Sequence, residues 1–262
     1  MEANRPPRSE RHPSRREILA GGMAATATAP LIGSAILRLG TGHAQSSTSE
    51  IKMPPHAFVY TELQISVPFD QGPWRQVNPV IRQQPGFLSK TWLFGLGTKS
   101  LGGFYSFDSV ENAKKFVTGY FPTETRRFGV THTTRVFDAE GVAEASTDMG
   151  SPYFGGITEQ APGAYVYTEL QLSIPFEQAP WRKRNPILKN QPGLLNKTWL
   201  SGLNNNSIGG FYAFETVEHA QRFALEDFPA ETARLDTAYY ARIFEAPPAA
   251  DASRDLNSPY YS

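Results

Sequence analysis

The sequence predicts an α+β protein in which two βαββαβ repeats form an intramolecular pseudo-dimeric barrel. Three observations support this prediction: the 262-residue chain repeats itself at a constant offset, both copies show the same order of strand and helix patterns, and 40% of the residues are hydrophobic. Of the 78 aligned positions from Tyr60 to Phe137, 41 are identical 107 residues later. A period of this length far exceeds that of solenoid repeats, so each copy is a small domain.

The matching segments also set the boundaries of the repeats. Tyr60-Thr61-Glu62-Leu63-Gln64 recurs at 167–171, and a Ser-Pro-Tyr sequence closes both copies. We therefore expect a first repeat over residues 56–154, a linker over 155–162 and a second repeat over 163–262. The two Ser-Pro-Tyr tails are expected to dock on the opposite repeat.

Each repeat begins with a strand and a helix. Apolar and polar residues alternate from Val59 to Val67, which is the period of a strand with two different faces. Trp74, Val77 and Ile81 follow at helical spacing within a segment that runs from about residue 73 to 84. This segment contains a proline, which weakens a helix, and ends at a Pro-Gly pair.

The second half of each repeat predicts a hairpin, a helix and a last strand. The hairpin strands cover residues 87–96 and 103–107. Ser109 can cap the following helix, which Pro122 is expected to end. With the last strand at 130–137, the order is that of a ferredoxin-like fold with sheet order 4-1-3-2. Helices on one face leave the other sheet face bare, and the second repeat is the simplest cover for it.

Residues 1–44 have the pattern of a twin-arginine signal peptide. Arg15-Arg16 precedes a Gly- and Ala-rich apolar stretch, and Gly42-His43-Ala44 offers small residues for cleavage. The alternative is an uncleaved membrane anchor, since about 20 apolar residues can span a bilayer. We expect cleavage, a flexible segment over 45–55, and a periplasmic or secreted protein. Its partners would include the twin-arginine export machinery, with only transient membrane contact through the signal.

Composition excludes several classes of function. Residues 1–44 hold six Arg and three Glu, which leaves 19 basic and 22 acidic residues and a net charge of −3. We therefore expect no nucleic-acid partner. The absence of cysteine removes thiol nucleophiles and Cys-based metal sites. No metal-ligand spacing, phosphate loop or nucleophile elbow is found, so we expect no metal and no cofactor.

The polar face of the first strand is the sharpest local feature. Tyr60, Glu62 and Gln64 are identical in the second copy, whereas on the opposite face Ile65 and Val67 change to Leu172 and Ile174. A solvated strand face would look similar, so two interpretations stay open: a solvent-facing strand or the lining of a pocket.

Lys90 and Trp92 lie on one side of the second strand, as do Lys197 and Trp199 in the copy. A buried lysine without a partner is costly, so Lys90 should be exposed or paired. In the predicted sheet order, an ion pair between Glu62 and Lys90 can form across the third strand. The alternative is a surface lysine beside a core tryptophan.

Two segments resemble the YdhR-type mono-oxygenases of the dimeric α+β barrel superfamily. They are Gln84-Pro85-Gly86-Phe87-Leu88-Ser89-Lys90-Thr91-Trp92 and Gly102-Gly103-Phe104-Tyr105-Ser106-Phe107, both with counterparts in the second repeat. The resemblance implies a pocket in each repeat and cofactor-independent oxygenation of small aromatic or quinol-type molecules. The chain departs from the pattern in fusing two units and in placing Ser66 and Ser173 where a histidine is expected.

The resulting hypothesis is an exported mono-oxygenase. Glu62 and Glu169 would accept a proton, and Lys90 and Lys197 would stabilise the developing oxyanion. The residues that would bind the substrate are Tyr60, Gln64, Trp92, Tyr105, Tyr167, Gln171, Trp199 and Tyr212. The alternatives are a non-catalytic periplasmic binding module that holds a small aromatic ligand and a structural partner of an exported complex.

Overall fold

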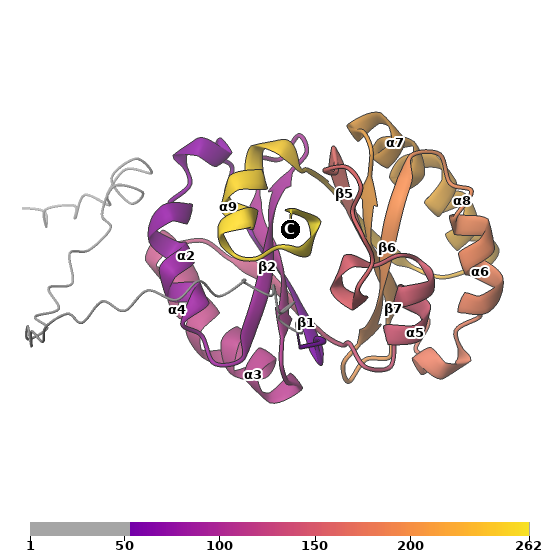
Figure 1. Ribbon diagram of the computed structural model, residues 1–262, viewed down its shortest axis with the longest axis horizontal. Helices are drawn as coiled ribbons and strands as arrows, with labels where there is room; N and C mark the ends of the chain where they lie inside the picture. Colours follow the sequence, from indigo (N-terminus) through magenta and orange to yellow (C-terminus); the bar gives the residue numbers. More distant parts are fainter. Residues whose placement is uncertain (1–52, 262) are drawn as a thin grey trace, which may run out of the picture.

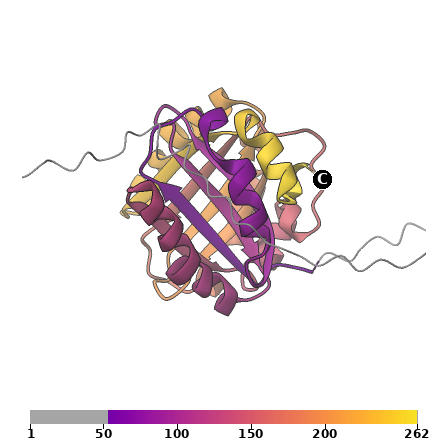
Figure 2. The same cartoon turned by 90° about the vertical axis from the view of Figure 1, so that its left-hand side faces the viewer.

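The computed structural model describes residues 53–261, which form a closed barrel of eight antiparallel strands (Figures 1 and 2). The predicted signal peptide and most of the predicted flexible segment lie outside the described residues. The first repeat supplies β1 (Ala57–Leu63), β2 (Phe87–Gly95), β3 (Leu101–Phe107) and β4 (His132–Asp138). The second supplies β5 (Ala164–Leu170), β6 (Leu194–Gly202), β7 (Ile208–Phe214) and β8 (Tyr239–Glu245).

The strand order around the barrel is β1-β3-β2-β8-β5-β7-β6-β4. Each repeat therefore has the predicted order 4-1-3-2, and the predicted α+β class is confirmed. Helices cover the outside of the barrel (Figure 1). They are α2 (Trp74–Arg82), α3 (Val110–Lys115), α4 (Phe121–Phe128), α5 (Ala143–Asp148), α6 (Trp181–Leu188), α7 (Val217–Arg222), α8 (Phe228–Arg234) and α9 (Ala250–Asp255).

The two repeats close the barrel through short seams. β2 pairs with β8 at Phe94 and Gly95, and β4 pairs with β6 at Phe137 and Asp138; one further backbone hydrogen bond extends each seam, from Leu96 to Ile243 and from Leu203 to Val136. The tail of the opposite repeat covers the rest of each seam. On β2, the backbone N–H of Lys90 donates to the Leu256 carbonyl oxygen at 2.9 Å, so α9 and its extension complete the edge that β8 leaves open.

Both tails dock on the opposite repeat, as predicted. The Thr91 hydroxyl of β2 lies 2.8 Å from the Ser258 hydroxyl, and the Thr198 hydroxyl of β6 lies 2.7 Å from that of Ser151. Each repeat thus contributes a helical tail to the surface of its partner repeat, and neither repeat is complete alone.

The helix that follows Ser109 does not end at Pro122, so this prediction is wrong. Ser109 caps α3 by accepting from the Asn112 backbone N–H, as predicted, but the helix continues through a π-helical turn (Phe116–Tyr120) into α4. Pro122 lies in the first turn of α4, where a missing N–H is tolerated after the wider turn. The second repeat has the same π turn at Phe223–Asp227.

Aromatic side chains fill the interior of the barrel. Tyr60 of β1 stacks on Tyr167 of β5 with ring centroids 4.0 Å apart, and Phe104 stacks on Phe211 at 4.4 Å. These strands are not neighbours in the sheet, so the contacts cross the barrel. The interior of the barrel is therefore a packed core. No helix within residues 53–261 combines the length and the apolar character needed to span a bilayer.

Candidate functional site

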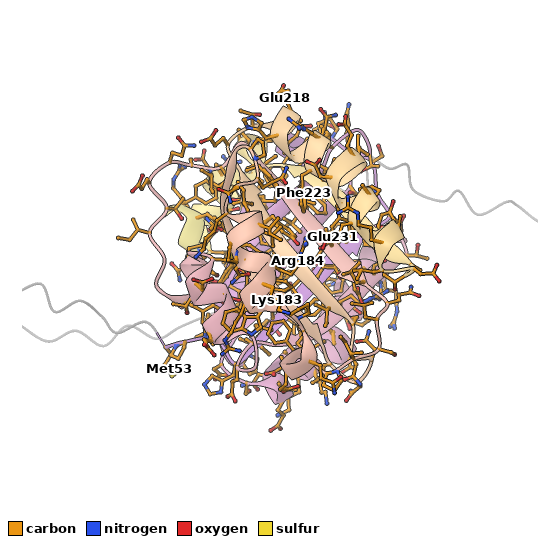
Figure 3. All side chains as sticks on the ribbon, turned by 90° about the vertical axis from the view of Figure 1, so that its right-hand side faces the viewer. Met53, Lys183, Arg184, Glu218, Phe223 and Glu231 are labelled. Carbon is orange, nitrogen blue, oxygen red and sulfur yellow. The ribbon has the colours of Figure 1, made fainter. Side chains whose placement is uncertain are left out.

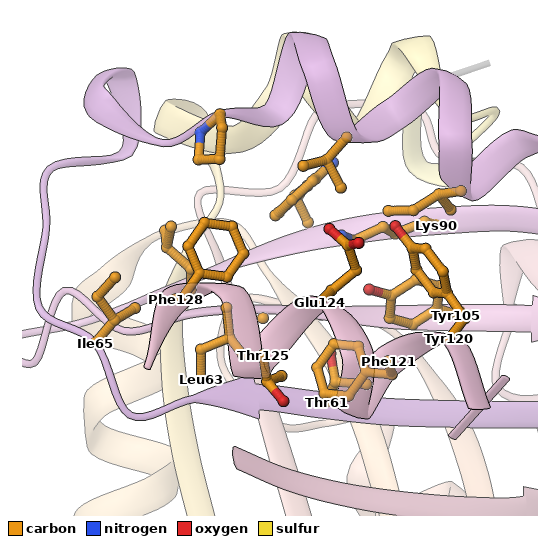
Figure 4. Close-up of a pocket in the computed structure, with 16 residues that line it drawn as sticks. Thr61, Leu63, Ile65, Lys90, Tyr105, Tyr120, Phe121, Glu124, Thr125 and Phe128 are labelled. Carbon is orange, nitrogen blue, oxygen red and sulfur yellow. The ribbon is translucent and has the colours of Figure 1, made fainter. Parts of the chain in front are cut away.

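Each repeat holds a pocket between its sheet and its helices, on the outside of the barrel. The first spans about 590 Å³, a volume that includes space open to solvent, and is shown in Figure 4. Its lining comes from three strands and two helices: Thr61, Leu63, Lys90, Trp92, Tyr105, Val77, Ile81, Tyr120, Phe121, Glu124, Thr125 and Phe128, among others. The corresponding pocket of the second repeat spans about 850 Å³, again with space open to solvent, and includes Thr168, Lys197, Trp199, Tyr212, Arg184, Phe228 and Glu231.

The residues predicted as one site are divided between the two faces of the sheet. Successive strand residues point to opposite sides, so Thr61 and Leu63 face the pocket while Tyr60 and Glu62 face the barrel interior. Gln64 lies beyond the end of β1 and is exposed. The second repeat shows the same division. The pockets thus bring together Lys90, Trp92 and Tyr105, and Lys197, Trp199 and Tyr212; they do not include Tyr60, Glu62, Gln64, Tyr167, Glu169 and Gln171.

Lys90 is almost completely buried, with 1% of its surface exposed, and the predicted ion pair with Glu62 is wrong. Its Nζ lies 2.9 Å from the centroid of the Trp92 ring and 4.8 Å from that of Tyr105. Burial lowers the pKa of Lys90 well below its ordinary value. The side chain therefore reaches the pocket with a proton that it loses more easily than an exposed lysine does, and its N–H groups can point at the indole ring.

Lys197 repeats this arrangement, with its Nζ 2.8 Å from the Trp199 ring centroid. Burial again lowers the pKa of Lys197, against an opposing effect of Glu231. The expectation that a buried lysine needs a charged partner fails in both repeats. The face of an aromatic ring takes the place of the carboxylate.

Gly103 explains how a lysine and a tyrosine ring share one position on the sheet. A Cβ atom at this residue would lie 2.5 Å from Lys90 Cε and 2.7 Å from Tyr105 Cε2. In the second repeat, a Cβ at Gly210 would lie 2.6 Å from both Lys197 Cε and Tyr212 Cε2. The Gly-Gly-Phe-Tyr sequence of β3 and β7 thus makes room for the lysine beside the aromatic wall.

Trp92 is held by a polar network that joins the two repeats. Its Nε1–H donates to Asn78 Oδ1 at 2.9 Å, and Asn78 Nδ2 donates to the Ala252 carbonyl oxygen and to Asp255 Oδ2, at 3.0 and 2.8 Å. The latter two belong to α9, the tail of the second repeat. Sequence reasoning assigned no such role to Asn78, although its identity with Asn185 was a visible indication.

Glu62 instead holds the two halves of the barrel together. It accepts hydrogen bonds from Tyr60 and Ser100 at 2.7 and 2.6 Å, and it forms an ion pair with Arg242 of β8. Burial alone would raise the pKa of Glu62, but the hydrogen bonds from Arg242, Ser100 and Tyr60 outweigh it and leave this pKa below its ordinary value. Glu62 is a stable carboxylate inside the barrel.

Glu169 is the counterpart of Glu62 in the second repeat. It accepts from Tyr167 at 2.7 Å and pairs with Arg135 of β4 at 3.2 Å. The identical residues on the polar strand face, which suggested a pocket, therefore form two related ion pairs across the barrel.

The helix that extends beyond Pro122 contributes pocket residues that sequence reasoning missed. Tyr120 and Glu124 line the first pocket, and Glu231 lines the second. The indication in the sequence was the pattern Phe-Pro-x-Glu-Thr, present at both 121–125 and 228–232. This pattern was missed because the helix was predicted to end at Pro122.

The two pockets differ at their openings. In the first, Val77 lies on α2 and Glu124 forms an ion pair with Arg127 at 2.8 Å. In the second, Arg184 takes the position of Val77 and forms an ion pair with Glu231 (Figure 3). The second pocket therefore has a charged opening, whereas the first remains mostly apolar.

Chemically, each pocket can hold a flat apolar molecule against tryptophan and tyrosine rings. The lysine amine can accept a proton from that molecule or attack it, and a carboxyl group lies in the same pocket. Within residues 53–261, no group of three or more His, Asp or Glu side chains is arranged to hold a metal ion.

Two ferredoxin-like halves that share one closed barrel, with a pocket beneath the helices of each, define a fused dimeric α+β barrel. The model of one family, described as "Putative mono-oxygenase ydhR", matches residues 63–148. The first repeat is therefore similar to this family, which confirms the resemblance seen in the sequence. The second repeat has the same residue as the first repeat at 41 of the 78 aligned positions.

Several solved structures are similar to the chain. One is an anthrone oxidase-like protein, with 17% identity and a TM-score of 0.47 over 75% of this chain and 92% of that one. Another is the "putative monooxygenase" of Lactobacillus acidophilus NCFM, with 9% identity and a TM-score of 0.41 over 72% and 93%. A mutant chlorite dismutase from Candidatus Nitrospira defluvii has 10% identity and a TM-score of 0.42 over 76% and 95%. No curated protein sequence matches the chain.

Proposed function

We propose that this protein is a cofactor-independent mono-oxygenase acting on small, electron-rich aromatic molecules of the phenol or quinol type. The observation that carries the proposal is the amine of Lys90, and of Lys197, which is buried in a pocket walled by aromatic rings, where burial lowers its pKa. The family whose model matches residues 63–148 supports oxygenation as the class of reaction.

The amine supplies the base that such a reaction needs. A phenol bound against Trp92 and Tyr105 can transfer its proton to Lys90 Nζ, which forms a phenolate and an ammonium group side by side. The Trp92 ring stabilises the new cation, and the apolar lining strengthens the attraction between the two charges. The electron-rich phenolate then reacts with O2, and the substrate itself supplies the electrons. One oxygen atom enters the ring as a carbonyl oxygen, and the other leaves as water with two hydrogens of the substrate, so that a phenol and O2 give a quinone and water.

This assignment moves the base from Glu62 and Glu169 to the lysines. Glu62 and Glu169 face the barrel interior and are already engaged by Arg242 and Arg135. The lysines keep their predicted part as partners of the oxyanion, because each becomes cationic in the proton transfer.

Replacing both lysines by methionine should abolish most of the activity. We expect Lys90→Met/Lys197→Met to lower oxygen uptake with anthrone-like and quinol compounds about 10²-fold or more, since the base is lost while the side-chain volume is kept. The measurement is oxygen consumption by purified protein with product analysis. Lys99→Met, at an exposed turn, is the matched control.

Two outcomes would contradict the proposal. Unchanged turnover in the double lysine variant would show that the lysines are not the base. A loss of activity confined to Glu62→Gln/Glu169→Gln would assign the base to the two glutamates inside the barrel. A ligand that native mass spectrometry finds retained and unaltered, with no oxygen uptake, would favour the non-catalytic binding module instead.

We further propose that residues 1–44 direct export by the twin-arginine machinery to the periplasm or the exterior. The support is the Arg15-Arg16 pair before an apolar stretch and a small-residue cleavage site. Replacing both arginines by lysine should leave the precursor in the cytoplasm, as judged by cell fractionation and N-terminal sequencing, whereas the same change at Arg5 and Arg8 should not. Equal export of the two variants would exclude this route.

A further inference from the structure

We propose that Lys90 and Lys197 capture carbonyl compounds covalently, so that the two pockets are binding sites for small aromatic aldehydes and ketones held as imines. The inference shares the pockets with the proposed function, but it requires no oxygen. It concerns a different reaction of the same two amines.

The first support is the contrast between these two lysines and the others in the described part of the chain. Lys115 pairs with Glu111 at 2.8 Å and Lys189 pairs with Asp148 at 2.7 Å, both on the surface. Lys90 and Lys197 are 1% and 2% exposed, and neither has a carboxylate within ion-pair distance. Each ends against an aromatic face inside a pocket lined mostly by apolar side chains.

The second support is that the fold keeps this amine at one place in both repeats. Gly103 and Gly210 leave the space for the lysine stem. The backbone N–H of Lys90 is fixed by Leu256, and that of Lys197 by Met149 at 3.3 Å. Both anchors come from the tail that the opposite repeat supplies. Nucleophilic amines in proteins are activated by such desolvation in an apolar pocket.

The chemical step uses only groups in the pocket and the ligand itself. The lone pair of Lys90 Nζ attacks the carbonyl carbon and forms a C–N bond, while the C=O π bond breaks and the oxygen takes one of the amine protons to become a hydroxyl. The nitrogen then forms the C=N bond and gives up its one remaining proton as the hydroxyl leaves as water, which gives a neutral imine. The net change is one amine and one carbonyl compound converted into one imine and one water.

Each pocket also has a carboxylate in its lining, held by an ion pair with an arginine. Glu124 lines the first pocket together with Lys90 (Figure 4), and Glu231 lines the second with Lys197. Burial lowers the pKa of both lysines, which favours the amine form that attacks a carbonyl group. The aromatic and aliphatic lining selects flat, apolar carbonyl compounds over small polar ones.

Reductive trapping tests the inference on the intact protein. Wild-type protein is incubated near pH 7, without oxygen, with 2-naphthaldehyde and cyanoborohydride, which delivers hydride to an imine carbon and makes the adduct permanent. Peptide mapping by mass spectrometry should place the adducts on Lys90 and Lys197. Exposed amines are almost fully protonated at this pH, so we expect an initial labelling rate about 10²-fold higher at the two buried lysines than at Lys99 or Lys114.

Controls separate this site from general amine chemistry. Lys90→Met/Lys197→Met should lose the fast labelling, and glyoxylate, a small polar aldehyde, should label wild-type protein without preference for these two positions. Adducts spread evenly over exposed lysines would overturn the inference, and mapping of the wild-type protein decides this even if the variant does not fold. Trapping of imines without oxygen uptake would support this inference and contradict the proposed function. Oxygen uptake without trapping would support the proposed function and contradict this inference.

Discussion

Deleting the chain from Ala249 onward should prevent the first repeat from forming a stable structure. The deleted tail covers the open edge of β2, and its Leu256 and Tyr260 side chains are 0% and 2% exposed. Loss of a buried leucine side chain alone costs about 2–5 kcal/mol. The backbone N–H groups of Lys90 and Trp92 would lose their acceptors, which adds about 1–3 kcal/mol for each if it stays buried.

Together these losses are comparable to the whole stability of a typical domain, about 5–15 kcal/mol. We therefore expect the truncated protein to lose its cooperative thermal transition, measured by circular dichroism, and to elute as an expanded species. Leu256→Ala should show a graded form of the effect. Asp251→Ala, on an 81% exposed side chain of the same helix, should be close to neutral. A truncated protein that melts like the full chain would show that the seam does not depend on the tail.

The repeat organisation was predictable because it depends on identity, which a sequence displays directly. The offset of 107 residues fixed the two units, and the alternation in β1 with the caps at Ser109 and Thr216 placed the elements in order. The docking of both tails also followed, because two identical Ser-Pro-Tyr ends must have equivalent environments.

The candidate site was predictable only in part, because alternation shows that a strand has two faces but not what each face meets. Tyr60 and Glu62 look like pocket residues in the sequence, but they face the other repeat. Their identity in both copies is explained by Arg135 and Arg242, which also correspond at the offset of 107. The two ion pairs between the repeats require Glu62 and Arg242, and Glu169 and Arg135, to stay unchanged. A comparison of the two copies cannot tell such a structural requirement from the requirement of a ligand site.

The prediction for Arg242 follows from this ion pair and has the largest effect expected of a single substitution. Arg242→Met leaves the Glu62 carboxylate, 1% exposed, without its cation, and removal of one partner from a buried pair costs about 3–5 kcal/mol. We expect this loss at pH 7 in chemical denaturation. Arg135→Met is the matched control: Glu169 is 11% exposed and Arg135 bonds it through one nitrogen, so the loss should be smaller.

The pH dependence of this loss distinguishes an unpaired charge from a packing defect. In the wild-type protein the pKa of Glu62 is lowered, so its contribution is fully present above the ordinary glutamate pKa of about 4.3 and is lost as the pH falls through the folded-state value. In Arg242→Met, burial without the cation should raise this pKa, so the variant should gain stability as the pH falls from 7 towards 5, where this group leaves the wild type unchanged. Adding Glu62→Gln to Arg242→Met should restore much of the stability and remove this pH dependence, because no charge remains to be buried. A deficit that stays constant between pH 7 and 5, and that Glu62→Gln does not relieve, would mean that Arg242 acts through its packing alone.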